Sequence, residues 1–152
     1  MHIIAYMIKE INKFKALGEE TRFRIVRLLI KSGMELCVCE IERIINKPQY
    51  NISKSLKILK NTGLIDERRD GKFVMYKIAN NISNLQLFNY ISSSEFSNDE
   101  FSNANDDVSN ENNNDQLNSD LINLNLILNL RVEGRIIVDR LQRDTKACLR
   151  CK

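Results

Sequence analysis

Apolar residues recur at intervals of three or four along the N-terminal half of the chain, a pattern typical of amphipathic helices. Glycines follow several of these stretches and are expected to end them. In the last stretch Ile52, Leu56 and Leu59 share one helical face, and a proline opens the helix because the first helical position needs no amide donor. The pattern predicts four helices, over residues 3–17, 20–32, 37–45 and from Pro48 to just before Gly63.

The pattern then changes to two strand-like runs in "LIDERRDGKFVMYKI". Asp70-Gly71 joins the runs, and this dipeptide is typical of a type I′ hairpin turn. Three helices, a fourth helix with a polar outer face and this hairpin predict a winged helix-turn-helix, mainly α with a small β-hairpin, over residues 1–80. The hairpin tip carries three positive charges, on Arg68, Arg69 and Lys72.

A change of composition after residue 80 predicts two further regions. Residues 81–116 are rich in Asn, Ser and Asp, and we expect an acidic, disordered linker because such a segment buries little apolar surface. Residues 117–152 are expected to form a C-terminal helix and a basic tail that contains two cysteines. Leucines at 117, 121, 124 and 128 form a helical stripe, whereas those at 124, 126, 128 and 130 alternate as in a strand; length favours the helix.

Charge is distributed unevenly along the chain. Residues 1–80 carry 16 Lys and Arg against nine Asp and Glu, a net charge of +7, while residues 81–130 carry −8 and the last 22 residues carry +4. A basic N-terminal domain suggests a phosphate-rich partner. With no basic leader and no run of 18 apolar residues, we expect a cytoplasmic protein with no membrane span. The four cysteines are then expected to be thiols or metal ligands.

The outer face of the fourth helix carries the side chains that a helix in the DNA major groove needs. Gln49 and Asn51 can pair with adenine edges, and the lysines suit phosphates. The hairpin arginines and Lys72 can reach flanking phosphates or the minor groove. Double-stranded operator DNA is therefore the expected partner, contacted from the fourth helix by Gln49, Tyr50, Asn51, Ser53, Lys54 and Lys57.

Two cysteines, Cys37 and Cys39, stand one residue apart in "ELCVCE". On a regular helix such neighbours point about 200° apart, so chelation by both should demand non-helical geometry at the start of the third helix. The alternative is a pair of ordinary core thiols, since free cysteine is often buried. A helix cannot turn both toward one core, and the flanking Glu35 and Glu40 make the site polar.

Residues 14–78 resemble the ArsR/SmtB family of metal-sensing winged-helix repressors. "LGEETRFRIVRLL" is similar to that family's second helix, "ELCVCEI" to its arsenic- and cadmium/lead-sensing motif, and "QYNISKSLKILKNTGLI" to its recognition helix. The resemblance implies a homodimeric repressor that binds its operator as the free protein and releases it when a metal or metalloid binds. It also implies that Cys37 and Cys39 are ligands. Thiolates favour thiophilic ions, As(III) first, then Cd(II) or Pb(II), with Zn(II) also suited.

The chain departs from this family in three places. Many arsenic-responsive members have a third cysteine where this chain has Glu42. Cys148 and Cys151 could supply further sulfurs, and four thiolates would suit tetrahedral Zn(II) or Cd(II); an unliganded tail, a separate redox pair or an unrelated metal clip are the alternatives. His2 is the only histidine, which excludes the family's histidine-carboxylate site. The Asn-rich segment leaves residues 3–17 as the expected dimer contact.

The alternatives to this interpretation are a redox-sensing repressor, a winged helix that binds only proteins, and an enzyme. A redox-sensing repressor would use the same DNA-binding residues with cysteine oxidation as its signal. A winged helix used only for protein contacts would bind DNA weakly and without sequence preference. An enzyme is not expected, because the sequence offers no nucleophile–histidine pairing and no glycine-rich phosphate loop, and no organic cofactor is expected.

Overall fold

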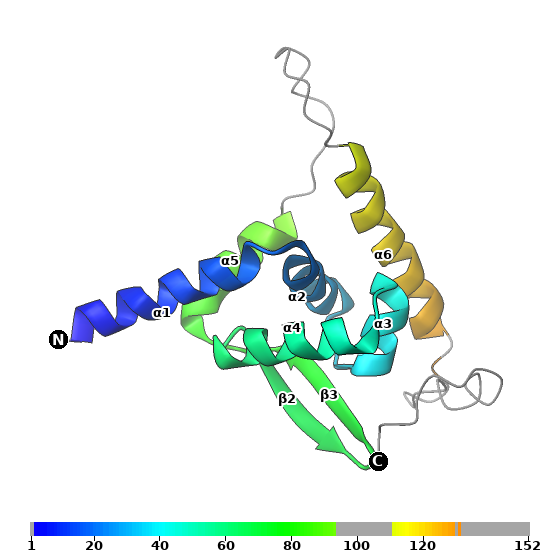
Figure 1. The fold of residues 1–152 in the computed structure, drawn as a ribbon, viewed down its shortest axis with the longest axis horizontal. Coiled ribbons are helices and arrows are strands. Elements are labelled where there is room, and N and C mark those ends of the chain that lie inside the picture. The colour runs from blue at the N-terminus through cyan, green and yellow to red at the C-terminus, as the bar shows by residue number, and fades with distance from the viewer. Residues whose placement is uncertain (1, 94–110, 130, 132–152) are drawn as a thin grey trace.

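The computed structural model describes residues 2–93, 111–129 and 131, which form a winged helix-turn-helix with an added C-terminal helix (Figure 1). This confirms the predicted fold class, mainly α with a small antiparallel sheet. None of the helices in the described part of the chain is long and apolar enough to cross a membrane. In chain order the elements are α1 (His2–Leu17), α2 (Glu20–Ser32), β1 (Leu36–Cys37), α3 (Val38–Ile45), α4 (Gln49–Asn61), β2 (Ile65–Asp70), β3 (Phe73–Ile78), α5 (Ile82–Ser93) and α6 (Glu111–Asn129).

The N-terminal helices lie where the sequence predicted them. The Glu19 carboxylate accepts hydrogen bonds from the first amides of α2, and Gly33 ends that helix with φ of 61°. The three apolar residues predicted to face inward from α4, Ile52, Leu56 and Leu59, are fully buried. They pack with α2 and α3 in the main core, which therefore supports α4 from its inner side.

A short strand, β1, was not predicted from the sequence. The sheet has the order β1-β3-β2, and Leu36 and Cys37 pair with Tyr76 and Met75 of β3. Cys37 is consequently extended, with φ of −86° and ψ of 164°, and α3 begins one residue later than expected. Two paired residues contain too little periodicity for a sequence pattern to reveal them.

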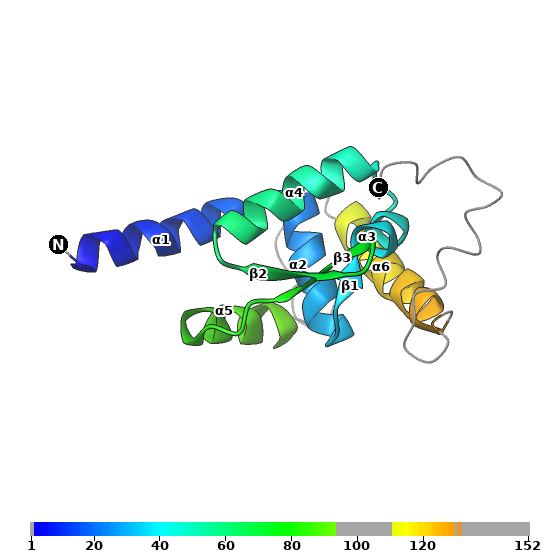
Figure 2. The same cartoon turned by 90° about the horizontal axis from the view of Figure 1, so that it is seen from below.

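The hairpin of β2 and β3, residues 65–78, is the predicted wing, but its turn is shifted by one residue. Asp70 pairs with Phe73, so Gly71 and Lys72 form the two-residue loop. Gly71 has φ of 59°, while Lys72 has no positive φ. This is the pattern of a type II′ turn rather than the predicted type I′ turn, and it places the unfavourable backbone conformation on glycine alone. Seen from below, the wing lies between α4 and α5 (Figure 2).

The prediction of a disordered linker over 81–116 is wrong at both of its ends. Residues 82–93 form α5, whose residues Asn84, Phe88 and Ile91 are buried at helical spacing. Asn84 Nδ2 donates to the carbonyl oxygen of Gly63 at 2.8 Å, which ties α5 to the end of α4. The segment as a whole is rich in Asn, Ser and Asp, so its composition did not reveal the three buried positions of α5. Helix α6 begins at residue 111, and residues 94–110 lie outside the described residues.

Helix α6 confirms the helical interpretation of the leucine stripe from 117 to 128. Leu124 is buried while Leu126 is 59% exposed, as a helix requires and a strand does not. The helix lies beside α3 and α2 (Figure 1). A buried ion pair holds it there: Arg24 of α2 donates to both oxygens of Asp120 at 2.7 and 2.8 Å. Arg24 also donates to the carbonyl oxygen of Ile45 at the end of α3, at 3.0 Å.

We expect the substitution Asp120→Ala to lower the free energy of unfolding by about 3 kcal/mol, because it leaves the Arg24 guanidinium buried without its main partner. Urea denaturation followed by circular dichroism measures this. The control is Asn118→Ala on the exposed side of α6, which should change stability by no more than about 0.5 kcal/mol. Equal effects of the two substitutions would contradict a structural role for the ion pair.

Candidate dithiol site and nucleic-acid interface

Cys37 and Cys39 are both buried, at 1% and 3% exposure, and both are thiols that take part in no disulfide. Together with Met75 of β3 they form a small apolar cluster, separate from the main core, against which Phe73 packs. On one regular helix, two cysteines a single residue apart cannot both face the same core. The structure resolves this because Cys37 belongs to β1 and only Cys39 lies in the first turn of α3.

The backbone at Cys37 is held by a side chain from α3. The amide of Cys37 donates to Oε2 of Glu40 at 2.9 Å, and the Glu40 carboxylate is fully buried. Arg131, just beyond α6, donates to both oxygens of that carboxylate at 2.8 Å. Non-helical geometry at Cys37, which the sequence argument expected ion binding to impose, is therefore already present. Sequence reasoning missed the role of Arg131 because 91 residues separate it from Glu40.

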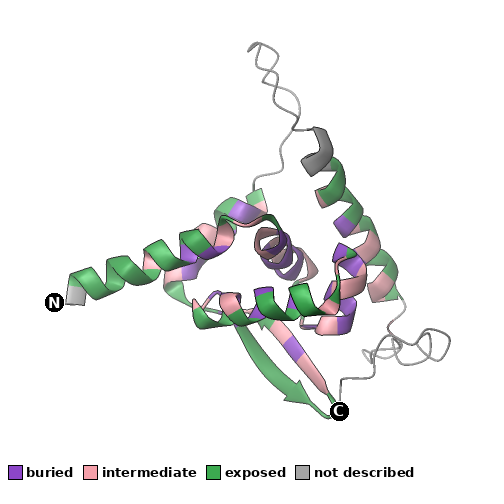
Figure 3. Ribbon diagram, viewed as in Figure 1, coloured by how far each residue is buried: buried purple, intermediate pink, exposed green. Residues whose placement is uncertain are grey.

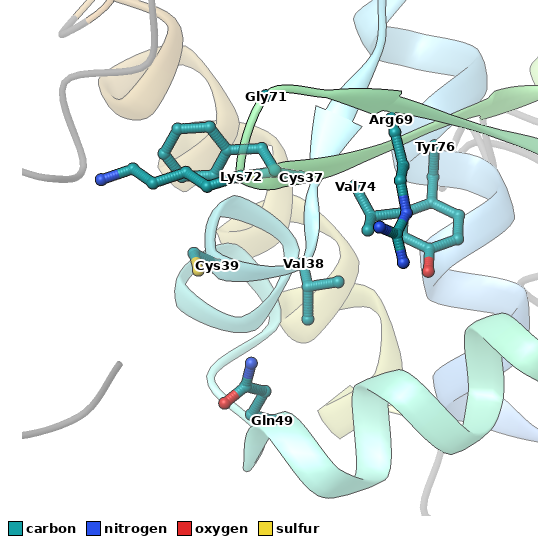
Figure 4. Close-up of a pocket in the computed structure, with 10 residues that line it drawn as sticks. Cys37, Val38, Cys39, Gln49, Arg69, Gly71, Lys72, Val74 and Tyr76 are labelled. Carbon is teal, nitrogen blue, oxygen red and sulfur yellow. The ribbon is translucent and has the colours of Figure 1, made fainter. Parts of the chain in front are cut away.

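A pocket of about 420 Å³ opens beside the two thiols. Besides the cysteines, its lining includes Gln49, the first residue of α4, and wing residues such as Arg69 and Tyr76 (Figure 4). The dithiol, the start of α4 and the wing thus border one space. The pocket therefore lies beside both elements that are predicted to face DNA.

Within the described ranges, no group of three or more His, Cys, Asp or Glu side chains is arranged to hold a metal ion. Cys37 and Cys39 alone would offer two donors, fewer than the three or four that thiophilic ions take. Cys148 and Cys151, the predicted additional sulfurs, lie outside the described residues. Glu42, which occupies the position of the family's third cysteine, is directed to α4, where its carboxyl group accepts a hydrogen bond from the backbone of Gln49, and burial raises its pKa.

The outer face of α4 presents the side chains predicted to contact DNA. Tyr50 is 76% exposed, and the face also exposes Asn51, Ser53, Lys54 and Lys57. Gln49 differs from the others because it is half-buried at the edge of the dithiol pocket. The structure therefore brings five of the six predicted side chains to one accessible surface, opposite the buried face of the helix.

The three predicted DNA contacts of the wing, Arg68, Arg69 and Lys72, are exposed, and Arg68 pairs with a carboxylate. Arg68 Nη2 lies 2.6 Å from Oε2 of Glu35, the residue before β1. Nζ of Lys72, at the tip of the wing, lies 5.3 Å from the centre of the Phe73 ring. The hydrogen bond from Arg68 lowers the pKa of Glu35. The sequence could not reveal the pair, because 33 residues separate its members.

The protein has the fold of a winged helix-turn-helix regulator. Its α4 is polar and cationic on the outer face, and two buried thiols lie beside the start of that helix. Residues 19–67 match the family described as bacterial regulatory protein, arsR family. A helix-turn-helix-type transcriptional regulator of Methanocaldococcus jannaschii is 43% identical over 65 residues, which span 43% of this chain and 72% of that protein. The chain belongs to the arsR family.

Two relatives have names that refer to metal or metalloid resistance. The arsenical resistance operon repressor of Escherichia coli is 42% identical over 47% of this chain, and a cadmium resistance transcriptional regulatory protein CadC homolog of Staphylococcus aureus is 42% identical over 43% of it. The chain spans 61% and 53% of the lengths of these two proteins. Similarity outside the winged helix is therefore not part of the match.

A solved structure supports the same fold. The homodimeric winged helix-turn-helix DNA-binding domain Mb0332 from Mycobacterium bovis is similar with a TM-score of 0.52 and 28% sequence identity. The similarity covers 58% of this chain and 79% of that domain.

The ion pair of the wing gives a prediction about pH. The lowered pKa of Glu35 means that the pair stabilises the protein above the unfolded-state pKa and is lost only as pH falls through the folded-state pKa. We expect Arg68→Gln to raise the pKa of Glu35, measured by NMR titration of its carboxyl carbon. The control Arg69→Gln alters the neighbouring arginine and should leave that pKa unchanged; an unchanged pKa in both variants would contradict the pairing.

Proposed function

We propose that this protein is a cytoplasmic transcriptional repressor that binds double-stranded operator DNA and releases it when a thiophilic metal or metalloid ion binds at Cys37 and Cys39. The observation that carries the proposal is the pocket that the two thiols share with the first residue of α4 and the wing. The names of the relatives, an arsenical resistance operon repressor and a cadmium resistance regulator, support arsenite as the first candidate and Cd(II) as the next. Pb(II) is a further candidate because thiolates also bind it.

The proposed DNA interface consists of the outer face of α4 and the wing. Exposed hydrogen-bonding residues near the start of α4 suit base edges in the major groove, and Lys54 and Lys57 suit the phosphates beside it. The wing adds Arg68, Arg69 and Lys72 for flanking phosphates. Arg68 has to exchange Glu35 for a phosphate when it binds DNA. Polar groups that read bases and cations that bind phosphates are thus adjacent on one surface.

The proposed ion site uses soft donors. Thiolates bind As(III), Cd(II), Pb(II) and Zn(II) in preference to hard cations, and two of them leave coordination positions open. We propose that Cys148 or Cys151 fills such a position, in the same subunit or the partner. The partial donor set at Cys37 and Cys39 supports this, because trigonal As(III) needs a third ligand and tetrahedral Cd(II) or Zn(II) a fourth.

The proposed coupling between ion and DNA runs through α3. Cys37 is held by β1 and Cys39 turns with α3, so an ion that draws the two sulfur atoms together has to displace the first turn of this eight-residue helix. Asn46 ends α3 in a left-handed conformation, and α4 begins three residues later. Because Glu42 also contacts the first amide of α4, a shift of α3 moves the start of the recognition helix. A coupling of about 1–3 kcal/mol is usual for such linkage.

We propose further that the repressor is a homodimer and that α1 contributes to its interface. Most of the apolar side chains of α1 are exposed in the described part of the chain, including Ile4 at 67% and Ile8 at 53%, and α1 is exposed over most of its length (Figure 3). Their exposure agrees with the expectation that residues 3–17 form the dimer contact. The homodimeric state of the similar Mb0332 domain supports the same assignment. In a monomer these apolar side chains of α1 would stay in contact with water, which is unfavourable for a patch of this size.

Replacing both cysteines with serine, Cys37→Ser and Cys39→Ser, should leave operator affinity unchanged without an ion and abolish release by arsenite and Cd(II). Fluorescence anisotropy with labelled operator measures both quantities. A matched variant, Cys148→Ser with Cys151→Ser, tests whether the second pair is needed. Release of the Cys37/Cys39 variant at wild-type arsenite concentrations would reject the site. Release of the wild type by peroxide, but by neither ion, would favour the redox alternative.

Operator binding should weaken steeply with salt. If a dimer neutralises roughly eight phosphates, log K falls against log salt concentration with a slope near −7. Lys54→Gln should make the slope less negative by about 2, since each lost phosphate contact contributes roughly 0.9 and a dimer loses two. Lys31→Gln in the last turn of α2, outside both the proposed DNA interface and the proposed dimer contact, is the control with equal loss of charge and should leave the slope unchanged. Weak binding without sequence preference would instead favour the protein-interaction alternative.

A further inference from the structure

A buried ion pair joins the end of the C-terminal helical region to the segment that carries the thiols. The side chain of Glu40 has no exposure, and that of Arg131 is 12% exposed. Nε of Arg131 donates to Oε1 of Glu40 and Nη2 donates to Oε2, both at 2.8 Å. This two-pronged arrangement fixes the orientation of the carboxylate as well as neutralising its charge.

The same two side chains also hold the backbone on both sides of β1. Oε2 of Glu40 accepts the amide of Cys37 at 2.9 Å, and Nη2 of Arg131 donates to the carbonyl oxygen of Glu35 at 2.8 Å. Residues 35, 37 and 40 are thereby tied to one guanidinium group. None of these bonds involves the outer face of α4 or the wing loop, so the arrangement has no direct part in the proposed DNA interface.

Groups behind the ligands of a metal site orient those ligands, and their removal commonly weakens metal affinity by about 10- to 100-fold. The carboxylate of Glu40 occupies this position relative to Cys37. It can hold the Cys37 backbone only while Arg131 compensates its buried charge, because an unpaired buried carboxylate is strongly unfavourable. The geometry at Cys37 therefore depends on a residue outside the winged helix.

We propose that Arg131 is a positioning residue for the thiophilic ion, acting through Glu40 on Cys37, so that the region following α5 is part of the sensor. This inference rests on the proposed function only in that Cys37 and Cys39 bind the ion. Because linkage is reciprocal, an ion held at the two thiols also strengthens the attachment of α6 to the rest of the protein.

The test measures Cd(II) binding to the full chain by the sulfur-to-cadmium absorption band, with a competing chelator to set the free ion concentration. Arg131→Met, which keeps much of the side-chain volume and removes the charge, should weaken Cd(II) binding at least tenfold. Arg131→Lys keeps the charge but not the two-pronged bond and should restore part of the affinity. Binding within twofold of the wild type in Arg131→Met would overturn the proposal.

The chain provides a matched control in the second buried pair that anchors α6. Asp120→Asn breaks the pair with Arg24, which is as deeply buried but makes no contact with residues 35–40. We expect it to lower thermal stability about as much as Arg131→Met and to leave Cd(II) affinity within twofold of wild type. Equal weakening of Cd(II) binding by Asp120→Asn would show that affinity follows stability, and would overturn a positioning role.

This experiment distinguishes the absence of an ion site from the absence of a positioning role for Arg131. A wild-type chain that gives no sulfur-to-cadmium band overturns the ion site itself, and the inference with it. A wild type that binds Cd(II) through Cys37 and Cys39 while Arg131→Met binds equally well leaves the proposed function intact and removes only the role of Arg131.

Discussion

The pairing of Leu36 and Cys37 with β3 is the constraint on which the dithiol site depends. It keeps Cys37 extended up to the residue before α3, so that one thiol belongs to the sheet and the other to the helix. Both sulfurs can then be buried beside Met75, which a continuous helix through the two positions would not allow. The strand has only two residues, and its position is maintained by side chains from outside the sheet.

Two buried ion pairs, Arg24–Asp120 and Arg131–Glu40, explain why α6 belongs to the same structural unit as the winged helix. Two buried carboxylates, Glu40 and Asp120, each require a buried arginine, and both pairs connect α6 or the residue beyond it to α2 and α3. Apolar contacts alone, such as that of Leu124, would allow the helix to slide or rotate along its neighbours. Directional bonds to fixed partners remove that freedom, since a displaced helix would leave charges buried without partners.

The sequence predicted the winged helix well and the added region poorly, for physical reasons. Apolar periodicity over a dozen residues marks helices such as α2 and α4, because their burial is on one continuous face. The strand β1 has no such signal, and the three buried positions of α5 were hidden in a segment of disorder-like composition. At the site, the sequence located Cys37 and Cys39 and the exposed face of α4. It could not locate Arg131 or the partner of Arg68, because ion pairs between distant residues leave no local pattern.

The position of the thiols bears on how an ion could act on DNA binding. Long allosteric pathways need a chain of elements that each have two arrangements. Here the dithiol pocket already touches Gln49 at the start of α4 and Arg69 on the wing, so both proposed DNA-facing elements border the site itself. Under the proposed function, a displacement of the first turn of α3 therefore changes the orientation of α4 and the position of the wing at the same time. Loss of register at two contact surfaces at once lowers DNA affinity more than the same displacement applied to either surface alone.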